Sequence, residues 1–256
     1  VYCDPHFSIF WAKFEGVPDK MTNTSMDETF SFVKQNIKNL KTIYMAGGEP
    51  FLIKENLKII DLIQKENPDL LLRINTNLSI LTPKIYKQLQ LLKNVHWIVS
   101  AEATGKKFNY IRWPGNYQTL IQNIKKIQQL PHKVTINMTW NLLCVSNIID
   151  FIDEMLEMGV HPNQFIMNCV QDPIEQSVRN ITKQRRDNLV EIIKQKQSKI
   201  NKNFFLFKVY TEMLDVLNQP LLDTHKTALY NTLMDFDTKR KLNSKEVFPE
   251  LYKEGI

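Results

Sequence analysis

The residues best suited to bind a polar ligand begin with Gly47-Gly48-Glu49-Pro50, which follow the segment Thr42–Ala46. Two adjacent glycines let the backbone approach a ligand without an intervening Cβ atom, and a glutamate carboxylate accepts hydrogen bonds from an ammonium group. An ordinary turn between a strand and a helix is the alternative interpretation of two glycines alone. The chain has only seven glycines in 256 residues, and this scarcity weakens the alternative.

Two later β-rich segments also end in polar side chains. Asn75, Thr76 and Asn77 end one of them, and their short side chains either bind a ligand or cap the turn. Ser100 and Glu102 follow the next; as alternate residues they point to one side, which suits a polyol such as ribose. The planar guanidinium of Arg112 suits a carboxylate. An amine acceptor, a hydroxyl binder and a carboxylate clamp together describe a site for a zwitterionic nucleoside.

Strand-like and helix-like segments alternate along the chain, as in an α/β sheet or partial barrel. Parallel strands with crossover helices produce this alternation, and their ligands bind at the carboxyl ends of the strands. The predicted strands are Thr42–Ala46, Leu70–Asn75, Val95–Ser100, Lys133–Trp140 and Gln164–Val170.

Helix signals lie between these segments. The apolar stripe from Ile148 to Leu156 predicts a helix with Asn147 as its N-cap and Gly159 at its end. Two further helix starts are predicted, a capping box at Ser25 and Glu28 and an N-cap followed by proline at Thr82 and Pro83.

The strand signal fades after about residue 172. The segment Thr182–Asn201 predicts a polar helix, and the remainder to Ile256 is predicted to be mainly helical. We therefore predict a core over residues 1–172 and a helical C-terminal extension over residues 173–256, with no linker between them.

Composition excludes several classes of protein. With 43% hydrophobic and 23% charged residues, and no apolar run long enough to cross a bilayer, we expect neither a membrane protein, nor collagen, nor a disordered chain. Three cysteines are too few and too scattered for a secreted disulfide framework, and no signal peptide is evident. We therefore expect a cytoplasmic protein.

Taken in order, these polar segments resemble the motifs of radical S-adenosylmethionine (SAM) enzymes, with Gly47-Gly48-Glu49-Pro50 the most specific. The resemblance is greatest to the subgroup with SPASM and twitch domains, and Phe248–Leu251 is similar to the tail of such proteins. It implies a partial (β/α)6 TIM-like barrel of parallel strands, the first strand missing, with a mainly helical C-terminal extension.

Radical SAM enzymes hold a 4Fe-4S cluster with three cysteines spaced C-x3-C-x2-C, usually with an aromatic residue before the third. Tyr2 fits that aromatic residue and Cys3 fits the third ligand. The resemblance then implies that the sequence begins inside the motif, that one cysteine precedes Val1 directly and another lies four positions earlier, and that the fragment alone is inactive. The alternative is that Cys3 is an ordinary thiol near a terminus.

The resemblance also implies the roles of the remaining residues. One iron would be bound by Cys3, and an iron without a cysteine ligand would chelate the amino and carboxylate groups of SAM. Pro50, Thr76 and Asn77 would belong to the cofactor site. Gly47, Gly48 and Glu49 would bind the methionyl amine, Arg112 the carboxylate, Ser100 and Glu102 the ribose, and Tyr2 would lie near the adenine.

Radical SAM chemistry would reductively cleave SAM to a 5′-deoxyadenosyl radical, which abstracts hydrogen from a peptide, a protein or a small molecule. The resemblance implies an electron donor such as flavodoxin or ferredoxin. Leu78, where the family commonly has glycine, and Glu102, where aspartate is frequent, depart from the family pattern. We expect Cys144 and Cys169 to be buried, and we expect no auxiliary cluster.

Three rival interpretations stand beside this one. An α/β enzyme could bind phosphate at the two glycines, but the chain has neither a Walker A lysine nor a G-x-G-x-x-G motif. A degenerate relative would keep the barrel without the chemistry. The net charge of +6 and a basic helix suggest a protein that binds nucleic acid or an acidic ligand, although Asp187 and Glu191 interrupt the run, and we do not expect nucleic acid. The cations of that helix are Lys183, Arg185, Arg186, Lys194, Lys196, Lys199 and Lys202.

Overall fold

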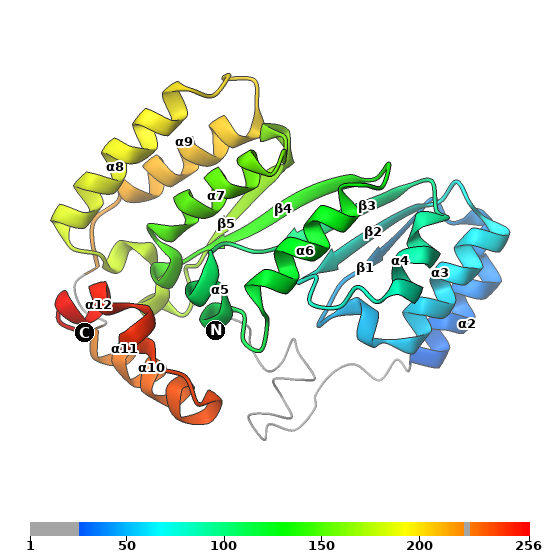
Figure 1. Cartoon of the computed structure of the whole chain (residues 1–256), viewed down its shortest axis with the longest axis horizontal. Helices are drawn as coiled ribbons and strands as arrows, with labels where there is room; N and C mark the ends of the chain where they lie inside the picture. Colours follow the sequence, from blue (N-terminus) through cyan, green and yellow to red (C-terminus); the bar gives the residue numbers. More distant parts are fainter. Residues whose placement is uncertain (1–25, 223–225) are drawn as a thin grey trace. The chain divides into compact units, whose positions relative to one another are not determined.

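A computed structural model of the chain describes residues 26–222 and 226–256 (Figure 1). These residues form two compact units. The N-terminal unit consists of residues 26–100 and 119–135, and the C-terminal unit of residues 101–118, 136–222 and 226–256. The division that the sequence suggests at residue 172 remains a prediction.

The five predicted strands are confirmed. They follow the order β1-β2-β3-β4-β5, and the pairs β1/β2, β2/β3 and β4/β5 are parallel. Together with the helical C-terminal part, they confirm an α/β fold of the partial-barrel type. The bounds are β1 (Thr42–Met45), β2 (Leu71–Thr76), β3 (Val95–Ser100), β4 (Lys133–Trp140) and β5 (Phe165–Cys169).

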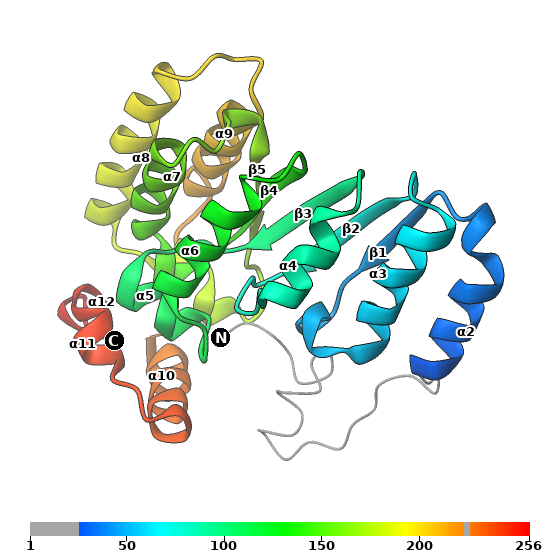
Figure 2. The same cartoon turned by 45° about the vertical axis from the view of Figure 1, so that its right-hand side comes forward.

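Helices of the N-terminal unit bury an apolar side against its strands. Residues of β2 alternate between buried and more exposed positions, so that Leu72 and Ile74 face the core while Arg73 is exposed. Helices α2 and α3 lie side by side (Figures 1 and 2). The helices are α2 (Met26–Asn36), α3 (Lys54–Glu66), α4 (Pro83–Gln90) and most of α6 (Tyr117–Ile127), with short 3₁₀ turns at η2 (Ile37–Asn39) and η3 (Pro50–Leu52).

The C-terminal unit is mainly helical, and its part after residue 172 is helical as predicted. Helices α8 and α9 lie side by side (Figures 1 and 2), and the ring of Phe248 packs edge-on against Tyr110. Its helices are α5 (Gly105–Ile111), α7 (Asn147–Glu157), α8 (Lys183–Ser198), α9 (Phe205–Leu217), α10 (Lys226–Arg240), α11 (Ser244–Val247) and α12 (Pro249–Lys253). Its 3₁₀ turns are η4 (Leu142–Cys144), η5 (Pro162–Gln164), η6 (Ile174–Gln176) and η7 (Val178–Asn180).

The helix starts predicted from sequence meet different outcomes. Thr82 caps α4 by accepting a hydrogen bond from the Ile85 N–H, which confirms the prediction. The prediction for Asn147 is wrong, because this residue is the first of α7 and its side chain instead accepts from the Thr104 N–H at 2.7 Å. The capping box at Ser25 lies outside the described residues.

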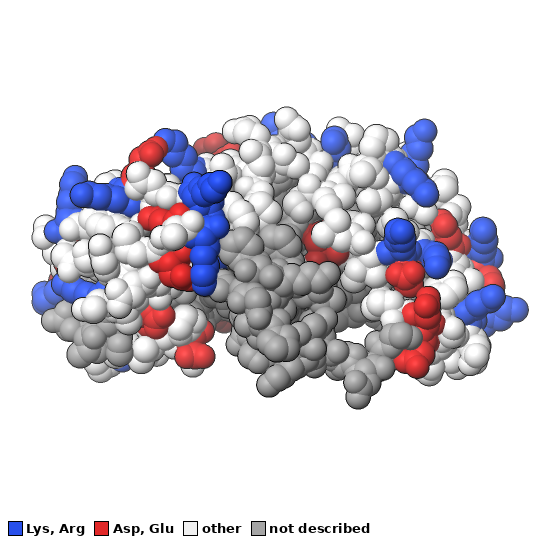
Figure 3. Space-filling model, turned by 90° about the horizontal axis from the view of Figure 1, so that it is seen from below, with Lys and Arg blue, Asp and Glu red and all other residues white. Residues whose placement is uncertain are grey.

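The described residues contain no helix that is both long enough and apolar enough to cross a bilayer. On the face drawn in Figure 3, lysine and arginine side chains lie among aspartate and glutamate side chains and do not form a uniform basic surface. Several cations of α8 are paired in the same way: Lys183 contacts Asp187 at 2.8 Å, and Lys196 contacts Asp153 of α7. Such pairing leaves less basic surface on α8 than the sequence suggests.

Candidate cofactor-binding site

Glu49 lies at the carboxyl end of β1 and is held by the neighbouring strand. The Thr76 hydroxyl, at the end of β2, lies 2.7 Å from Oε1 and 2.9 Å from Oε2 and donates to the carboxylate. The Asn77 N–H donates to Oε2 at 3.0 Å. This contact follows from the topology, because adjacent parallel strands bring their carboxyl ends to one edge of a sheet.

The carboxyl group of Glu49 is buried, and no cation of the described residues pairs with it. Only 7% of the residue is exposed. Burial raises the pKa of Glu49 to about 7, although the hydrogen bonds from Thr76 and Asn77 favour the charged form. A buried carboxyl group that accepts hydrogen bonds but has no counter-ion among the described residues is suited to receive a cationic group from a ligand.

Gly47 and Gly48 form the loop before this carboxylate. Both have left-handed backbone conformations, with φ of +88° and +54°, which are strained for any residue with a Cβ atom. A Cβ atom added to either glycine would meet no heavy atom of the described residues within 4 Å. The space beside the loop is therefore open, and a ligand can reach the backbone there. Pro50 begins η3 directly after the loop, and its carbonyl accepts from the buried Asn56 side chain at 3.0 Å.

The loop after β2 is fixed by two contacts that the sequence analysis did not identify. The Thr76 hydroxyl accepts from the Leu78 N–H at 2.8 Å, and the buried Asn123 side chain of α6 donates to the Leu78 carbonyl at 3.0 Å. Asn123 interrupts the apolar stripe of α6, and this was the signal that could have found it. Asn77 accepts from the Ser79 N–H at 2.9 Å, so its side chain caps the turn.

Ser100, at the end of β3, is bonded to its neighbour on β2. Its hydroxyl donates to Asn75 Oδ1 at 3.0 Å. No hydrogen bond between described residues joins this pair to Glu49. Asn75, which the sequence offers as a polar strand end together with Thr76 and Asn77, therefore fixes the hydroxyl of Ser100.

Glu102 and Arg112, both in the C-terminal unit, are bonded to each other. Arg112 Nε donates to Oε1 at 2.8 Å and Arg112 Nη2 donates to Oε2, which gives a bidentate ion pair. Glu102 is completely buried. The two residues predicted to bind ribose and carboxylate therefore satisfy one another in this structure, and their roles toward a cofactor remain predictions.

The structure describes two of the three cysteines, Cys144 and Cys169. Tyr2 and Cys3 lie outside the described residues. Cys144 is fully buried, as expected, and burial together with the charge of Glu102 raises the pKa of its thiol. Cys169 is only half-buried, contrary to expectation, because it lines a cavity of about 220 Å³ at the end of β5. Partial burial still raises the pKa of its thiol. Among described residues, no three His, Cys, Asp or Glu side chains form a metal site.

The sequence matches the radical SAM superfamily over residues 1–143, which is more than half of the chain. The chain belongs to this superfamily, as its motifs predicted. No curated protein matches the sequence.

Solved structures with the same fold share little sequence with the chain. Streptococcus suis SuiB has a TM-score of 0.51 and 15% identity, and the match covers 76% of this chain and 47% of SuiB. SuiB bound to precursor peptide SuiA has a TM-score of 0.51 and 18% identity, covering 75% of this chain and 45% of that one. Native anSMEcpe with bound AdoMet has a TM-score of 0.50 and 14% identity, covering 81% and 57%. The chain spans about half the length of these proteins.

Proposed function

We propose that the chain is the cofactor-binding barrel of a radical SAM enzyme of the SPASM and twitch-domain subgroup, and that this enzyme modifies a peptide or protein. The observation that carries the proposal is the buried carboxyl group of Glu49, which has no counter-ion among the described residues and lies beside two glycines that border open space. Membership of the superfamily and the likeness of the fold to SuiB support it.

The residues present fit the cationic end of SAM. Without the cluster, the amino group of SAM is an ammonium group with a positive charge and three donors, and Glu49 supplies the acceptor oxygens that such a group needs. Thr76 and Asn77 act as positioning residues, because they hold both carboxylate oxygens in place. Gly47 and Gly48 let the ligand contact the backbone.

The other contacts of the cofactor are proposed on the resemblance. Ser100 would bind the ribose, with Asn75 fixing its hydroxyl, and Tyr2 would lie near the adenine. Arg112 would bind the SAM carboxylate. It would then have to hydrogen-bond both that carboxylate and Glu102, its partner in the structure. Cys3 and two cysteines encoded before Val1 would ligate the 4Fe-4S cluster. Bound together, cluster and SAM supply radical abstraction of a hydrogen atom once an electron donor such as flavodoxin or ferredoxin reduces the cluster.

The pH dependence of SAM binding tests the role of Glu49. Only the ionised carboxylate attracts the ammonium group, so the affinity should rise roughly tenfold per pH unit below about pH 7 and level off above it. Calorimetric titration of the chain with SAM measures this. Glu49→Gln should weaken binding and remove the pH dependence, whereas Glu66→Gln, at an exposed position on α3, should change neither. Equal affinity of Glu49→Gln and the parent chain would exclude Glu49 as the amine ligand.

The identity of the residues encoded upstream of Val1 tests whether the protein can hold the 4Fe-4S cluster and cleave SAM. We expect a cysteine directly before Val1 and another four positions earlier, and any other pair would exclude the cluster. The longer protein, reconstituted with iron and sulfide without oxygen, should release 5′-deoxyadenosine from SAM under a reductant, and Cys3→Ala should abolish this release. SAM binding without any release would identify a degenerate relative.

A further inference from the structure

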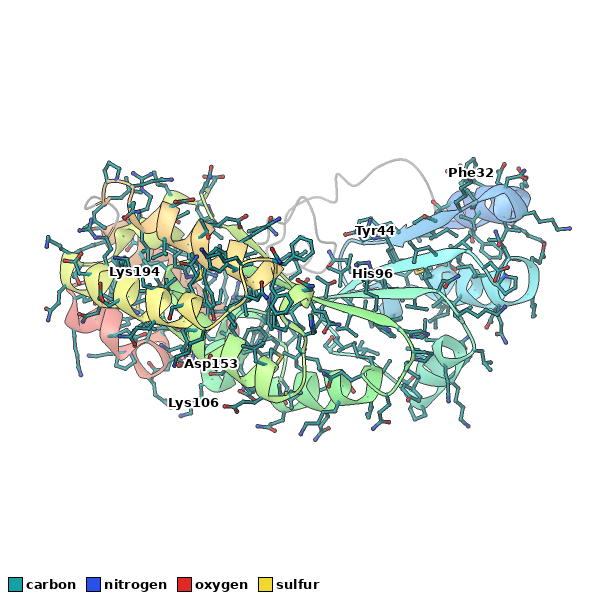
Figure 4. All side chains as sticks on the ribbon, turned by 90° about the horizontal axis from the view of Figure 1, so that it is seen from above. Phe32, Tyr44, His96, Lys106, Asp153 and Lys194 are labelled. Atoms are coloured by element: carbon teal, nitrogen blue, oxygen red, sulfur yellow. The ribbon has the colours of Figure 1, made fainter. Side chains whose placement is uncertain are left out.

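Three side chains form a row across β1, β2 and β3, on the side of the sheet that faces away from α3 and α4. Tyr44 is the register partner of Arg73, and Arg73 is the register partner of His96, so the three point to the same face at spacings of about 5 Å. Figure 4 shows Tyr44 and His96 on this side. Tyr44 is 54% exposed, and the Arg73 guanidinium lies 5.3 Å from the centre of its ring.

The row continues onto the amino-terminal part of β4. His96 Nε2 lies 2.8 Å from the Thr135 hydroxyl, and Lys133, two residues before Thr135, points to the same face. Arg73 and Lys133 are both exposed, and neither has a carboxylate partner among the described residues. We call Tyr44, Arg73, His96 and Lys133 the basic row.

The charge of the basic row comes from its two cations alone near neutral pH. Burial, with the charges of Lys133 and Arg73, lowers the pKa of His96 to about 4, so its imidazole is neutral and acts as a hydrogen-bonding group. Tyr44 adds a neutral ring beside Arg73. A face with two cations, and no anion from the described residues, attracts a negatively charged ligand.

We propose that the basic row binds the carboxylates of an acidic peptide segment that lies on the sheet; the proposal rests on the proposed function, whose substrate it specifies. An arginine fork bonds both oxygens of a carboxylate, and Lys133 supplies a second point charge. The ring of Tyr44 and the partly exposed Leu71, which precedes Arg73 by two residues on the same face, offer apolar contact to the stems of the acidic side chains.

Two observations favour a peptide over a nucleic acid. A nucleic-acid surface neutralises many phosphates, whereas the basic row has only Arg73 and Lys133. Arg73, His96 and Lys133 also lie in the amino-terminal halves of β2, β3 and β4. Arg73 precedes Thr76 by three residues, or about 10 Å along the strand. A peptide at Arg73 therefore leaves the Glu49 loop, at the carboxyl ends, available for the cofactor.

Binding of defined peptides to the full chain tests this proposal. The probes are fluorescein-labelled acetyl-tetraglutamate amide and acetyl-tetraglutamine amide, which differ only in their carboxylates, with oligothymidylate as the nucleic-acid probe. By fluorescence anisotropy near neutral pH, the glutamate peptide should bind more tightly than the other two. Arg73→Gln and Lys133→Gln should each weaken this binding roughly tenfold, whereas Lys84→Gln, a matched loss of charge on α4, should not. The ring resonances of His96 should shift only with the glutamate peptide.

Three results would overturn the proposal: equal binding of the two peptides, unchanged binding by Arg73→Gln, or tighter binding of oligothymidylate that depends on Arg73.

SAM titrations on the same samples separate this proposal from the proposed function. Arg73→Gln should bind SAM as the parent chain does. A parent chain that binds the glutamate peptide but not SAM would refute the function and leave the basic row standing.

Discussion

Two buried glutamates of this molecule are stabilised in opposite ways. Glu49, in the N-terminal unit, accepts hydrogen bonds from Thr76 and Asn77, has no cationic partner among the described residues, and has a pKa raised by burial to about 7. Glu102, in the C-terminal unit, is bound by two nitrogens of Arg112. The first carboxyl group can still gain a counter-ion, whereas the second already has one. Burial of a carboxylate therefore indicates a ligand site only where its charge is uncompensated.

Breaking the ion pair between Glu102 and Arg112 should have the largest effect on stability. Arg112→Ala leaves the fully buried Glu102 without its counter-ion, and we expect it to lower the free energy of unfolding by about 3–5 kcal/mol. Urea denaturation measures this loss. The double variant Arg112→Met with Glu102→Leu should lose less, because it removes both charges. A loss below about 1 kcal/mol in Arg112→Ala would show that Glu102 finds another partner.

Glu49 should make the stability of the chain depend on pH. Its pKa lies near 7 in the folded state and near 4.5 otherwise, so the folded state binds the extra proton between these values. The stabilisation is complete below about pH 4.5 and is lost as the pH rises through about 7, by up to about 3 kcal/mol. Urea denaturation over this range should show a smaller decline in Glu49→Gln than in Glu66→Gln. Identical dependence of stability on pH in the two variants would contradict the raised pKa of Glu49.

Replacing a glycine by alanine should affect stability differently in the C-terminal unit, at Gly115, and in the N-terminal unit, at Gly48. A Cβ atom at Gly115 would lie 2.8 Å from the Arg112 carbonyl oxygen, so Gly115→Ala should cost about 2 kcal/mol of stability. Gly48→Ala meets no atom and should cost only about 1 kcal/mol through its backbone conformation, while it weakens SAM binding. Thermal unfolding and SAM titration separate the two effects. A larger loss of stability at Gly48 would show that its surroundings are already filled.

The smallest effect concerns Leu78, where the family commonly has glycine. Leu78 is fully buried and has a left-handed φ of 54°, so the backbone keeps the conformation that favours glycine. Leu78→Gly should be more stable than Leu78→Ala by about 1 kcal/mol. At the buried Leu89 in α4, the order should reverse, because glycine is unfavourable in a helix. The same order at both positions would contradict strain at Leu78.

The sequence predicted the strands closely because their apolar and β-branched residues are distinctive. The bounds of β3 and β4 agree with the prediction at both ends, and those of the other strands differ by one residue. The contact between Glu49 and Thr76 was also within reach, since both follow predicted parallel strands.

Other features depend on spatial neighbours that a single sequence does not specify. A glutamate just after a predicted strand and an arginine ten residues later are compatible with two ligand contacts or with one ion pair, and the fold brings Arg112 and Glu102 together. Asn147 has the residue type of an N-cap, but its side chain accepts a hydrogen bond from the N–H of Thr104, which is far away in the sequence. Arg73 and His96 look like ordinary polar positions of alternating strands until the register places them side by side.

With the proposed function and the proposed peptide site, the position of Arg73 on β2 would decide which residue of a bound peptide is modified. Arg73 and Thr76 belong to one rigid strand, so the distance between an anchored carboxylate and the cofactor end of the sheet is fixed at about 10 Å. An extended peptide covers this length in about three residues. The sheet would thus act as a ruler, selecting the target by its distance from an acidic residue.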